Sequence, residues 1–255
     1  MQIARKQRRR KMKIEGIISK ISQIAAGIII YMLCAGFYLS AKGFQMLPDG
    51  NIVLVKSAQA QTDINSLVSP VASNVALSLP EGPILGSASA PITIYEFSSL
   101  NCSHCADFHT SVLPLLKPEF IDSGNVKFIF THFPLDRKAM KAAMLTECVP
   151  EENYGHFIST LFKKQREWML SRNTEDVLIR YAMLNGMTEA QAKECLTNDD
   201  LAKDLLEIRQ QGLDRLDIKG TPAFLVVKGS QREMLYGAPD YKTFKTYLQT
   251  KILSK

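Results

Sequence analysis

Two cysteines separated by two residues are the side chains of this sequence whose type and spacing point most directly to chemistry. Cys102-Ser103-His104-Cys105 is a CxxC motif, whose two thiols can close a small disulfide and reopen it. A turn at residues 98–101 precedes the motif and a predicted helix follows it, so the positive end of that helix would stabilise a Cys102 thiolate. His104, when protonated or donating, would add to this effect. Because a stabilised thiolate favours the reduced form, the oxidised pair would be a strong oxidant of other thiols.

A CxxC motif alone is compatible with redox chemistry, with structural zinc or with haem attachment. Haem attachment requires a histidine directly after the second cysteine, where this chain has Ala106. Structural zinc usually takes two such pairs, whereas Cys148 and Cys195 stand singly. We therefore favour a redox-active disulfide that needs no cofactor and no metal. Cys102 would be the exposed attacking sulfur, and Cys105, one turn further along, the buried resolving one.

A proline far downstream supports the redox interpretation. Gly220-Thr221-Pro222 directly precedes an apolar stretch that reads as a buried strand. Proline is tolerated at the start of a strand because it need not donate to the ladder. If the Thr221–Pro222 bond is cis, the backbone of Thr221 could lie beside the CxxC motif and hydrogen-bond an extended substrate chain. The alternative is an ordinary proline at the start of a strand; together with the CxxC motif, we favour the cis form.

The elements that must position these residues follow from the pattern of apolar side chains. The predicted elements are strands at 91–97, 125–132, 223–227 and 233–236, a helical block at about 136–212, and a last helix from about residue 240. Within the block, Thr188 to Gln191 form a capping-box sequence, and Gly212 is predicted to end a helix. This order predicts an α/β fold, one sheet with helices on its faces. The block is too long for one crossover helix and predicts an inserted helical subdomain.

Positive charge is concentrated at the N-terminus of the 255-residue chain, whose formal net charge is +6. Residues 1–42 carry nine lysines and arginines and one acid, a net charge of +8. The remaining residues carry 22 bases and 24 acids, a net charge of −2. A protein that binds nucleic acid through its folded body would carry its basic charge there, so we exclude a nucleic-acid partner.

The same N-terminal segment, residues 1–42, has the pattern of a signal or a membrane anchor. Its charges precede an apolar run at 24–39, intermediate in length between a signal-peptide core and a full membrane span. Positive charge before the run predicts that the N-terminus stays in the cytoplasm while the rest crosses. The bulky Leu39 disfavours cleavage directly after the run, so we expect an uncleaved inner-membrane anchor, with a cleaved signal as the alternative. Residues 43–88 lack periodicity and are predicted to be a linker, with a short strand at 52–55, before a domain at 89–255.

Taken together, several of these motifs resemble the DsbA family. The resemblance covers residues 85–253 approximately and is carried by Gly86–Pro91, Glu96-Phe97-Ser98, the CxxC motif and Gly220–Ala223. It implies a thioredoxin fold with an inserted helical domain, acting in the bacterial periplasm. It further implies oxidation of unfolded or partly folded exported proteins that have free cysteines, and reoxidation by a membrane quinone-linked partner. The chain departs from the best-known members at Ser103, where they have proline, and at Thr221, where some oxidases have valine.

The resemblance also suggests roles for residues outside the motif. Glu96 matches the family's buried acid beneath the active site and could exchange a proton with Cys105; the alternative is an edge carboxylate that faces water. His109, His132 and His156 are each expected to be packing or solvated residues rather than catalytic ones.

Cys148 and Cys195 are the remaining cysteines of the predicted domain. In an oxidising compartment they favour a structural disulfide, nominally worth about 4 kcal/mol for a loop of this length. The alternative is two unpaired buried thiols.

Three functions compete on this sequence. The leading hypothesis is a disulfide oxidase. The second is a membrane-tethered reductase or isomerase of the same fold, against which the chain has Asn101 where such enzymes usually have tryptophan. The third is a non-enzymatic binding or chaperone module, which the complete CxxC motif, Glu96 and Pro222 disfavour.

Overall fold

The chain divides into two compact units, residues 1–56 and 57–255, and each is described here by itself. The computed structural model describes residues 44–46, 52–54, 67–72, 77 and 82–253. In the first unit, β1 (Phe44–Met46) and β2 (Ile52–Leu54) pair as antiparallel strands. The predicted anchor at 24–39 lies outside the described residues. Within the described ranges, no helix has the length and apolar character needed to cross a membrane.

The second unit is built on a six-stranded sheet. Its strands are β3 (Val68–Pro70), β4 (Ile84–Leu85), β5 (Ile92–Ser98), β6 (Val126–His132), β7 (Ala223–Lys228) and β8 (Gln231–Tyr236). They lie in the order β3-β8-β7-β5-β6-β4. β5 lies near the middle, runs parallel to β6 and antiparallel to β7. Such a position buries both faces of a strand, which accounts for its apolar sequence.

A helical run follows β5 directly and covers one face of the sheet. It consists of α3 (Ser103–Asp107), η1 (Phe108–Val112), α4 (Leu113–Leu116) and η2 (Lys117–Ile121), where η1 and η2 are π-helical turns. Pro114 and Pro118 interrupt this run because a proline has no N–H to donate to the preceding turn. The C-terminal helix α11 (Tyr241–Leu253) packs beside α4 on the same face.

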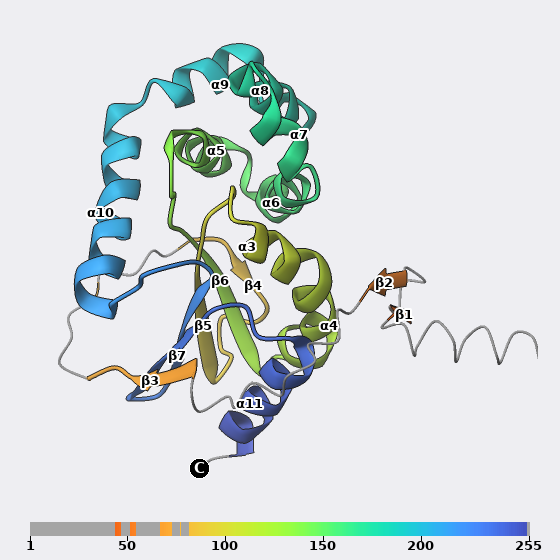
Figure 1. Ribbon diagram of the computed structural model, residues 1–255, viewed down its shortest axis with the longest axis vertical. Coiled ribbons are helices and arrows are strands. Elements are labelled where there is room, and N and C mark those ends of the chain that lie inside the picture. The colour runs from red at the N-terminus through yellow and green to blue at the C-terminus, as the bar shows by residue number, and fades with distance from the viewer. Residues whose placement is uncertain (1–43, 47–51, 55–66, 73–76, 78–81, 254–255) are drawn as a thin grey trace, which may run out of the picture. The chain divides into compact units, whose positions relative to one another are not determined.

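The predicted helical insertion is present as a group of six α-helices. They are α5 (Arg137–Cys148), α6 (Tyr154–Lys163), α7 (Gln165–Leu170), α8 (Thr174–Leu184), α9 (Glu189–Leu196) and α10 (Asp199–Leu216), with a short 3₁₀ turn η3 (Glu151–Asn153) before α6. Figure 1 shows α5 to α9 gathered beyond one end of the sheet, while α10 returns along its side. The predicted α/β fold with an inserted helical subdomain is therefore confirmed.

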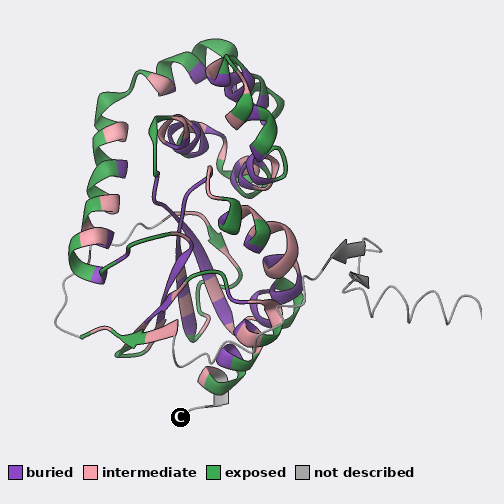
Figure 2. Cartoon of the chain, in the orientation of Figure 1, coloured by how far each residue is buried: buried purple, intermediate pink, exposed green. Residues whose placement is uncertain are grey.

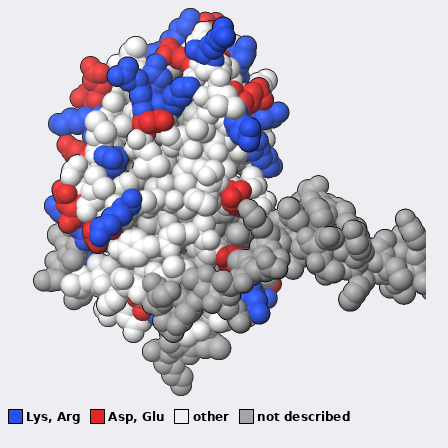
Figure 3. All heavy atoms as spheres, in the orientation of Figure 1, with Lys and Arg blue, Asp and Glu red and all other residues white. Residues whose placement is uncertain are grey.

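Burial divides the second unit into three apolar clusters. One lies between the sheet and the α4/α11 layer, one lies where α10 meets the other face, and the largest fills the helical insertion. Figure 2 shows the central strands buried along their length, whereas α10 is exposed on its outer side. On the face drawn in Figure 3, positive and negative side chains are interspersed over the helices, as expected for a solvated surface.

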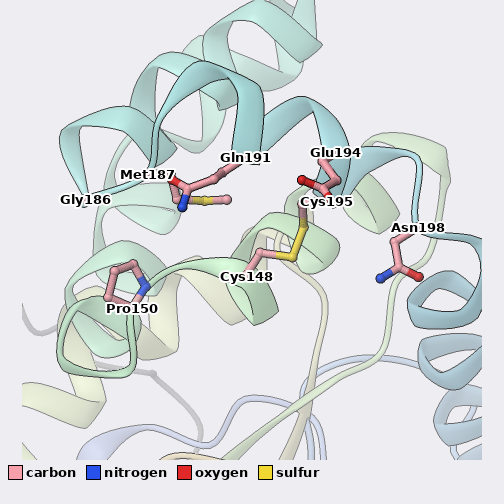
Figure 4. Close-up of a pocket in the computed structure, with 8 residues that line it drawn as sticks. All are labelled: Cys148, Pro150, Gly186, Met187, Gln191, Glu194, Cys195 and Asn198. Carbon is pink, nitrogen blue, oxygen red and sulfur yellow. A yellow bond between two sulfur atoms is a disulfide. The ribbon is translucent and has the colours of Figure 1, made fainter.

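A disulfide joins Cys148 at the end of α5 to Cys195 in α9, with Cα atoms 6.3 Å apart. The predicted pairing is therefore present, and it ties the first helix of the insertion to a much later one. The bridge borders a surface hollow of about 370 Å³ whose rim includes Pro150, Met187 and Asn198, as the close-up in Figure 4 shows.

The structure corrects two expectations about boundaries. Part of the predicted linker at 43–88 belongs to the sheet, because β3 pairs with the outer edge of β8 and β4 with that of β6. Two- and three-residue strands are too short to leave a periodic pattern in the sequence. Gly212 does not end its helix: α10 continues to Leu216, and the residue with a left-handed backbone is Asp217, at φ 50°.

Gly212 is needed instead for close packing. A Cβ atom at this position would lie 2.8 Å from a ring carbon of Phe133 and 3.2 Å from Ile218. Phe133 is itself buried, with its ring edge-on to Phe97. The glycine therefore allows α10 to approach the end of β6.

We expect Gly212→Ala to lower the free energy of unfolding by about 1 kcal/mol, because the strain of overpacking exceeds the gain in helix propensity. Urea unfolding followed by circular dichroism would measure the change. The matched control is Gly155→Ala in α6, where the nearest atom to an added Cβ is 3.9 Å away. That variant should be as stable as the unaltered protein or more so. Equal effects at the two positions would show that helix propensity, not the Phe133 contact, decides the outcome.

Candidate active site

The CxxC motif lies where β5 ends and the helical run begins. The N–H of Cys102 donates to the carbonyl of Ser99 at 2.9 Å, which closes the turn. Cys102 then serves as the N-cap of α3, and its sulfur accepts the N–H of Cys105 at 3.3 Å. Sulfur thus occupies the position where a helix offers unpaired N–H groups and a positive partial charge.

Strand register brings the proline loop to the same place. Phe97 near the end of β5 pairs with Ala223 at the start of β7, so the residues just before β7 lie beside the turn that follows β5. The Thr221–Pro222 bond is cis, as predicted. The thiol of Cys102 donates to the carbonyl of Thr221 at 3.3 Å. Residues 119 positions apart in the chain therefore form one site.

The surroundings of Cys102 lower the pKa of its thiol from 9.0 to about 6. The largest cause is a hydrogen bond from the thiol of Cys105; partial burial acts in the opposite direction, and the Thr221 side chain and the N–H groups of Cys105 and His104 lower the pKa further. These surroundings therefore favour the thiolate form of Cys102 over that of an ordinary cysteine. The imidazole of His104 is exposed, so the structure assigns to this residue a contribution from its backbone.

Cys105 has the opposite character. Its side chain is fully buried, and burial is the main reason that its pKa lies above the usual range. The hydrogen bond that it gives to Cys102 and the negative charge of Glu96 act in the same direction. The two sulfurs of one motif therefore differ sharply in acidity, and whenever Cys105 leaves a disulfide it must take up a proton.

Glu96 lies under the active-site helix. Ile92, Ile94 and Glu96 alternate along β5 and share the face that the helical run covers. The carboxyl group is fully buried, so the alternative of a carboxylate that faces water is wrong. One of its oxygens lies 2.6 Å from Nε2 of His109. The sequence had assigned His109 to packing or solvent; the structure gives it a polar role as the partner of this acid.

Gln165, at the start of α7, was missed by the sequence analysis. Its side-chain amide donates to the carbonyls of Leu100 and Cys102, at 2.8 and 2.9 Å. The buried glutamine therefore fixes the turn that carries the motif to the helical insertion. A single glutamine in a helical pattern carries no sequence signal for such a contact.

The other predicted residues lie away from the motif. His132 pairs with Glu147 at 3.0 Å, and His156 lies 2.7 Å from the side chain of Asn185. Cys148 and Cys195 are bonded to each other in the insertion. Among the described residues no cluster of histidine, cysteine or acid side chains has the geometry of a metal site.

Comparisons with solved structures show that the overall fold is shared with known proteins. The structure of α-DsbA1 from Wolbachia pipientis superimposes with a TM-score of 0.63 at 28% identity, and covers 71% of this chain and 95% of that chain. BdbD from Bacillus subtilis superimposes with a TM-score of 0.60 at 24% identity, over 68% of this chain and 94% of that chain, which bears on the fold alone.

Sequence comparisons match the chain to a thioredoxin family model and to proteins named for disulfide chemistry. A family model described as thioredoxin matches residues 78–250. The disulfide bond formation protein D of Bacillus subtilis is 26% identical over 181 residues, 68% of this chain and 78% of that protein. A candidate protein-disulfide oxidoreductase of Rickettsia bellii is 28% identical over 151 residues, which are 59% of this chain. The matched region spans 58% of that Rickettsia protein.

We expect Cys105→Ala to raise the pKa of Cys102 above its value of about 6, because it removes the hydrogen bond that lowers that pKa most. Only the thiolate reacts with iodoacetamide, so the measurement is the pH dependence of Cys102 alkylation in the reduced protein. The rate should fall as the pH falls through about 6 in the unaltered protein, and at a higher pH in the variant. Cys105→Ser keeps a hydrogen-bond donor and should shift the midpoint less; a midpoint unmoved by Cys105→Ala would contradict the assignment.

Proposed function

Because the chain belongs to the thioredoxin family, as a DsbA-like member, we propose that it is a thiol:disulfide oxidoreductase that introduces disulfides into exported proteins. The observation that carries the proposal is the acidity of Cys102 at the helix N-terminus beside a cis-proline. A thiolate that is stable at neutral pH makes the reduced enzyme the favoured form, so the oxidised pair readily accepts electrons from other thiols.

The reaction follows from the difference between the two sulfurs. A substrate thiolate attacks Cys102 in the oxidised enzyme, the Cys102–Cys105 bond breaks, and Cys105 leaves and takes up a proton. A second substrate thiolate then attacks the substrate sulfur of the mixed disulfide. Cys102 departs as a thiolate, which is a good leaving group because its pKa is low.

The proline loop has a binding role in the proposal. The backbone of Thr221 lies beside Cys102 and can hydrogen-bond an extended substrate chain next to the reacting sulfur. A hollow of about 400 Å³ beside this loop, which Gly220, Tyr236 and Gly237 also line, offers room for the chain. His104 remains a proposed catalytic residue, since a protonated imidazole near the sulfur would favour the thiolate.

The place of action and the partners also belong to the proposal. We infer a bacterial periplasmic enzyme tethered to the inner membrane through residues 24–39, on the strength of the basic segment before that apolar run. Unfolded exported proteins with free cysteines would be its substrates. A membrane quinone-linked oxidant would restore the disulfide.

We expect the Cys102–Cys105 pair to have a reduction potential between about −120 and −180 mV, the span of strong oxidants and of disulfide isomerase. The full chain would be equilibrated with glutathione buffers, trapped by alkylation and quantified by mass spectrometry. A double variant, Cys148→Ala with Cys195→Ala, removes the second disulfide from the thiol balance. Because the bridge joins α5 to α9 and the variant keeps the Gln165 contacts with the active-site turn, it should lower stability but give nearly the same potential. A value of about −270 mV, the potential of thioredoxin, would contradict the oxidase hypothesis and favour a tethered reductase.

A further inference from the structure

A cavity of about 520 Å³ opens between the active-site helix and α6. Its wall is largely apolar and includes Leu113, Phe128, Phe130 and Ile158. His109 is also part of this wall. This side chain belongs to η1, the π-helical turn that directly follows the CxxC helix.

The pair of His109 and Glu96 leads from the cavity into the core. The carboxyl group of Glu96 is 0% exposed, whereas the imidazole is 8% exposed and reaches the cavity. The second oxygen of Glu96 is buried and has no hydrogen-bond partner among the described residues. A buried oxygen without a partner is rare and asks for a functional explanation. Cys105 stands four residues before His109 in the same helical run, a spacing that puts its buried thiol on the same helix face as the imidazole that contacts Glu96. The charge of Glu96 accordingly raises the pKa of Cys105.

Aromatic side chains hold the imidazole in place. The ring of Phe162 stacks on His109 at a centroid distance of 4.3 Å, and Phe130 meets it edge-on at 5.5 Å. With its faces packed in this way, the ring keeps Nε2 directed at Glu96. The imidazole is therefore fixed toward Glu96 while it remains slightly exposed at the cavity.

We propose that His109 is the positioning residue through which Glu96 exchanges protons with water in the cavity, so that Cys105 can lose and regain its proton at each turnover. The proposal deepens the proposed function and rests on it for the exchange reaction itself. It applies in both directions of that reaction, whether the enzyme oxidises or reduces its substrates.

The step is clearest when the reduced enzyme reacts with oxidised glutathione. Cys102 first attacks and forms a mixed disulfide, which releases one glutathione thiolate. The proton of Cys105 then passes to the Glu96–His109 pair and on to water. The Cys105 thiolate attacks the Cys102 sulfur, the bond from Cys102 to glutathione breaks, and a second glutathione thiolate leaves. The enzyme dithiol is oxidised by two electrons, and one glutathione disulfide is reduced to two thiols.

Other ionisable groups share the cavity with His109. Its wall carries Lys117, Glu151, Glu152, Tyr154 and His156. His156 is a second imidazole on the same cavity, but it pairs with Asn185 instead of an acid beneath the active site. It therefore provides a matched control.

The test measures two rate constants in one reaction of the full chain with oxidised glutathione, by rapid quench and mass spectrometry. The mixed disulfide forms while Cys105 stays protonated, so the rate constant of formation serves as the internal reference. Resolution of the mixed disulfide requires Cys105 to lose its proton. We expect His109→Ala to slow resolution by about a hundredfold, the contribution typical of general acid–base catalysis, and to leave formation within about twofold. Added imidazole should restore much of the lost rate, since the cavity gives it access to the vacated position.

The controls separate proton transfer from structural support. His156→Ala should change neither rate constant, and imidazole should not affect it. His109→Gln keeps an N–H donor but cannot take up a proton, so it should remain slow in resolution. Full activity of the glutamine variant, equal slowing of both steps, or no rescue by imidazole would each overturn the proposal. A reduction potential near that of thioredoxin would contradict the oxidase hypothesis but not the role of His109, because the mixed disulfide must be resolved in either direction of the reaction.

Discussion

Hydrogen bonds that converge on the sulfur of Cys102 determine what the rest of the structure must supply. The N–H groups come from the first turn of a helix, so the chain must leave β5 and enter that helix within a few residues. The Thr221 contact comes from the loop before β7, so β7 must pair beside β5 in a fixed register. The motif and the helix that it opens supply most of the acidity of Cys102, and the sheet brings Thr221 beside the sulfur.

The acidity of Cys102 has a consequence for Cys105, the other cysteine of the disulfide. Stabilising one sulfur as a thiolate while the second is buried means that only one charge is held well. Every exchange must then move a proton to or from a site without direct access to water. Glu96 lies on the face of β5 beneath the helix, and His109 connects it to a cavity. The large difference in acidity between the two thiols therefore creates the need for a proton-transfer pair, and Glu96 with His109 meets that need.

The sequence was informative wherever a contact follows from local chemistry. The CxxC motif, the capping box at Thr188 and the central strands each leave a pattern within a few residues, and the structure contains them. The cis form of the Thr221–Pro222 bond was predicted only from the proline together with the distant CxxC motif. The contact of His109 with Glu96 was not predicted, although Cys105 stands four residues before His109, a spacing that puts both on one helix face. That signal was present but weak, because many buried helix faces carry a lone histidine. β3, β4 and the role of Gly212 depend on partners far along the chain, and no local pattern encodes those partners.

The helical insertion contributes directly to the active site through Gln165. Its amide holds the carbonyls of Leu100 and Cys102, the residues that set the direction of the helix N-terminus. The insertion is in turn braced by the bridge from Cys148 to Cys195. A disulfide that takes no part in exchange therefore stabilises the subdomain that positions the exchanging one. The arrangement links the rigidity of the insertion to the geometry at Cys102, because a shift of α7 would move two acceptors of the active-site turn together.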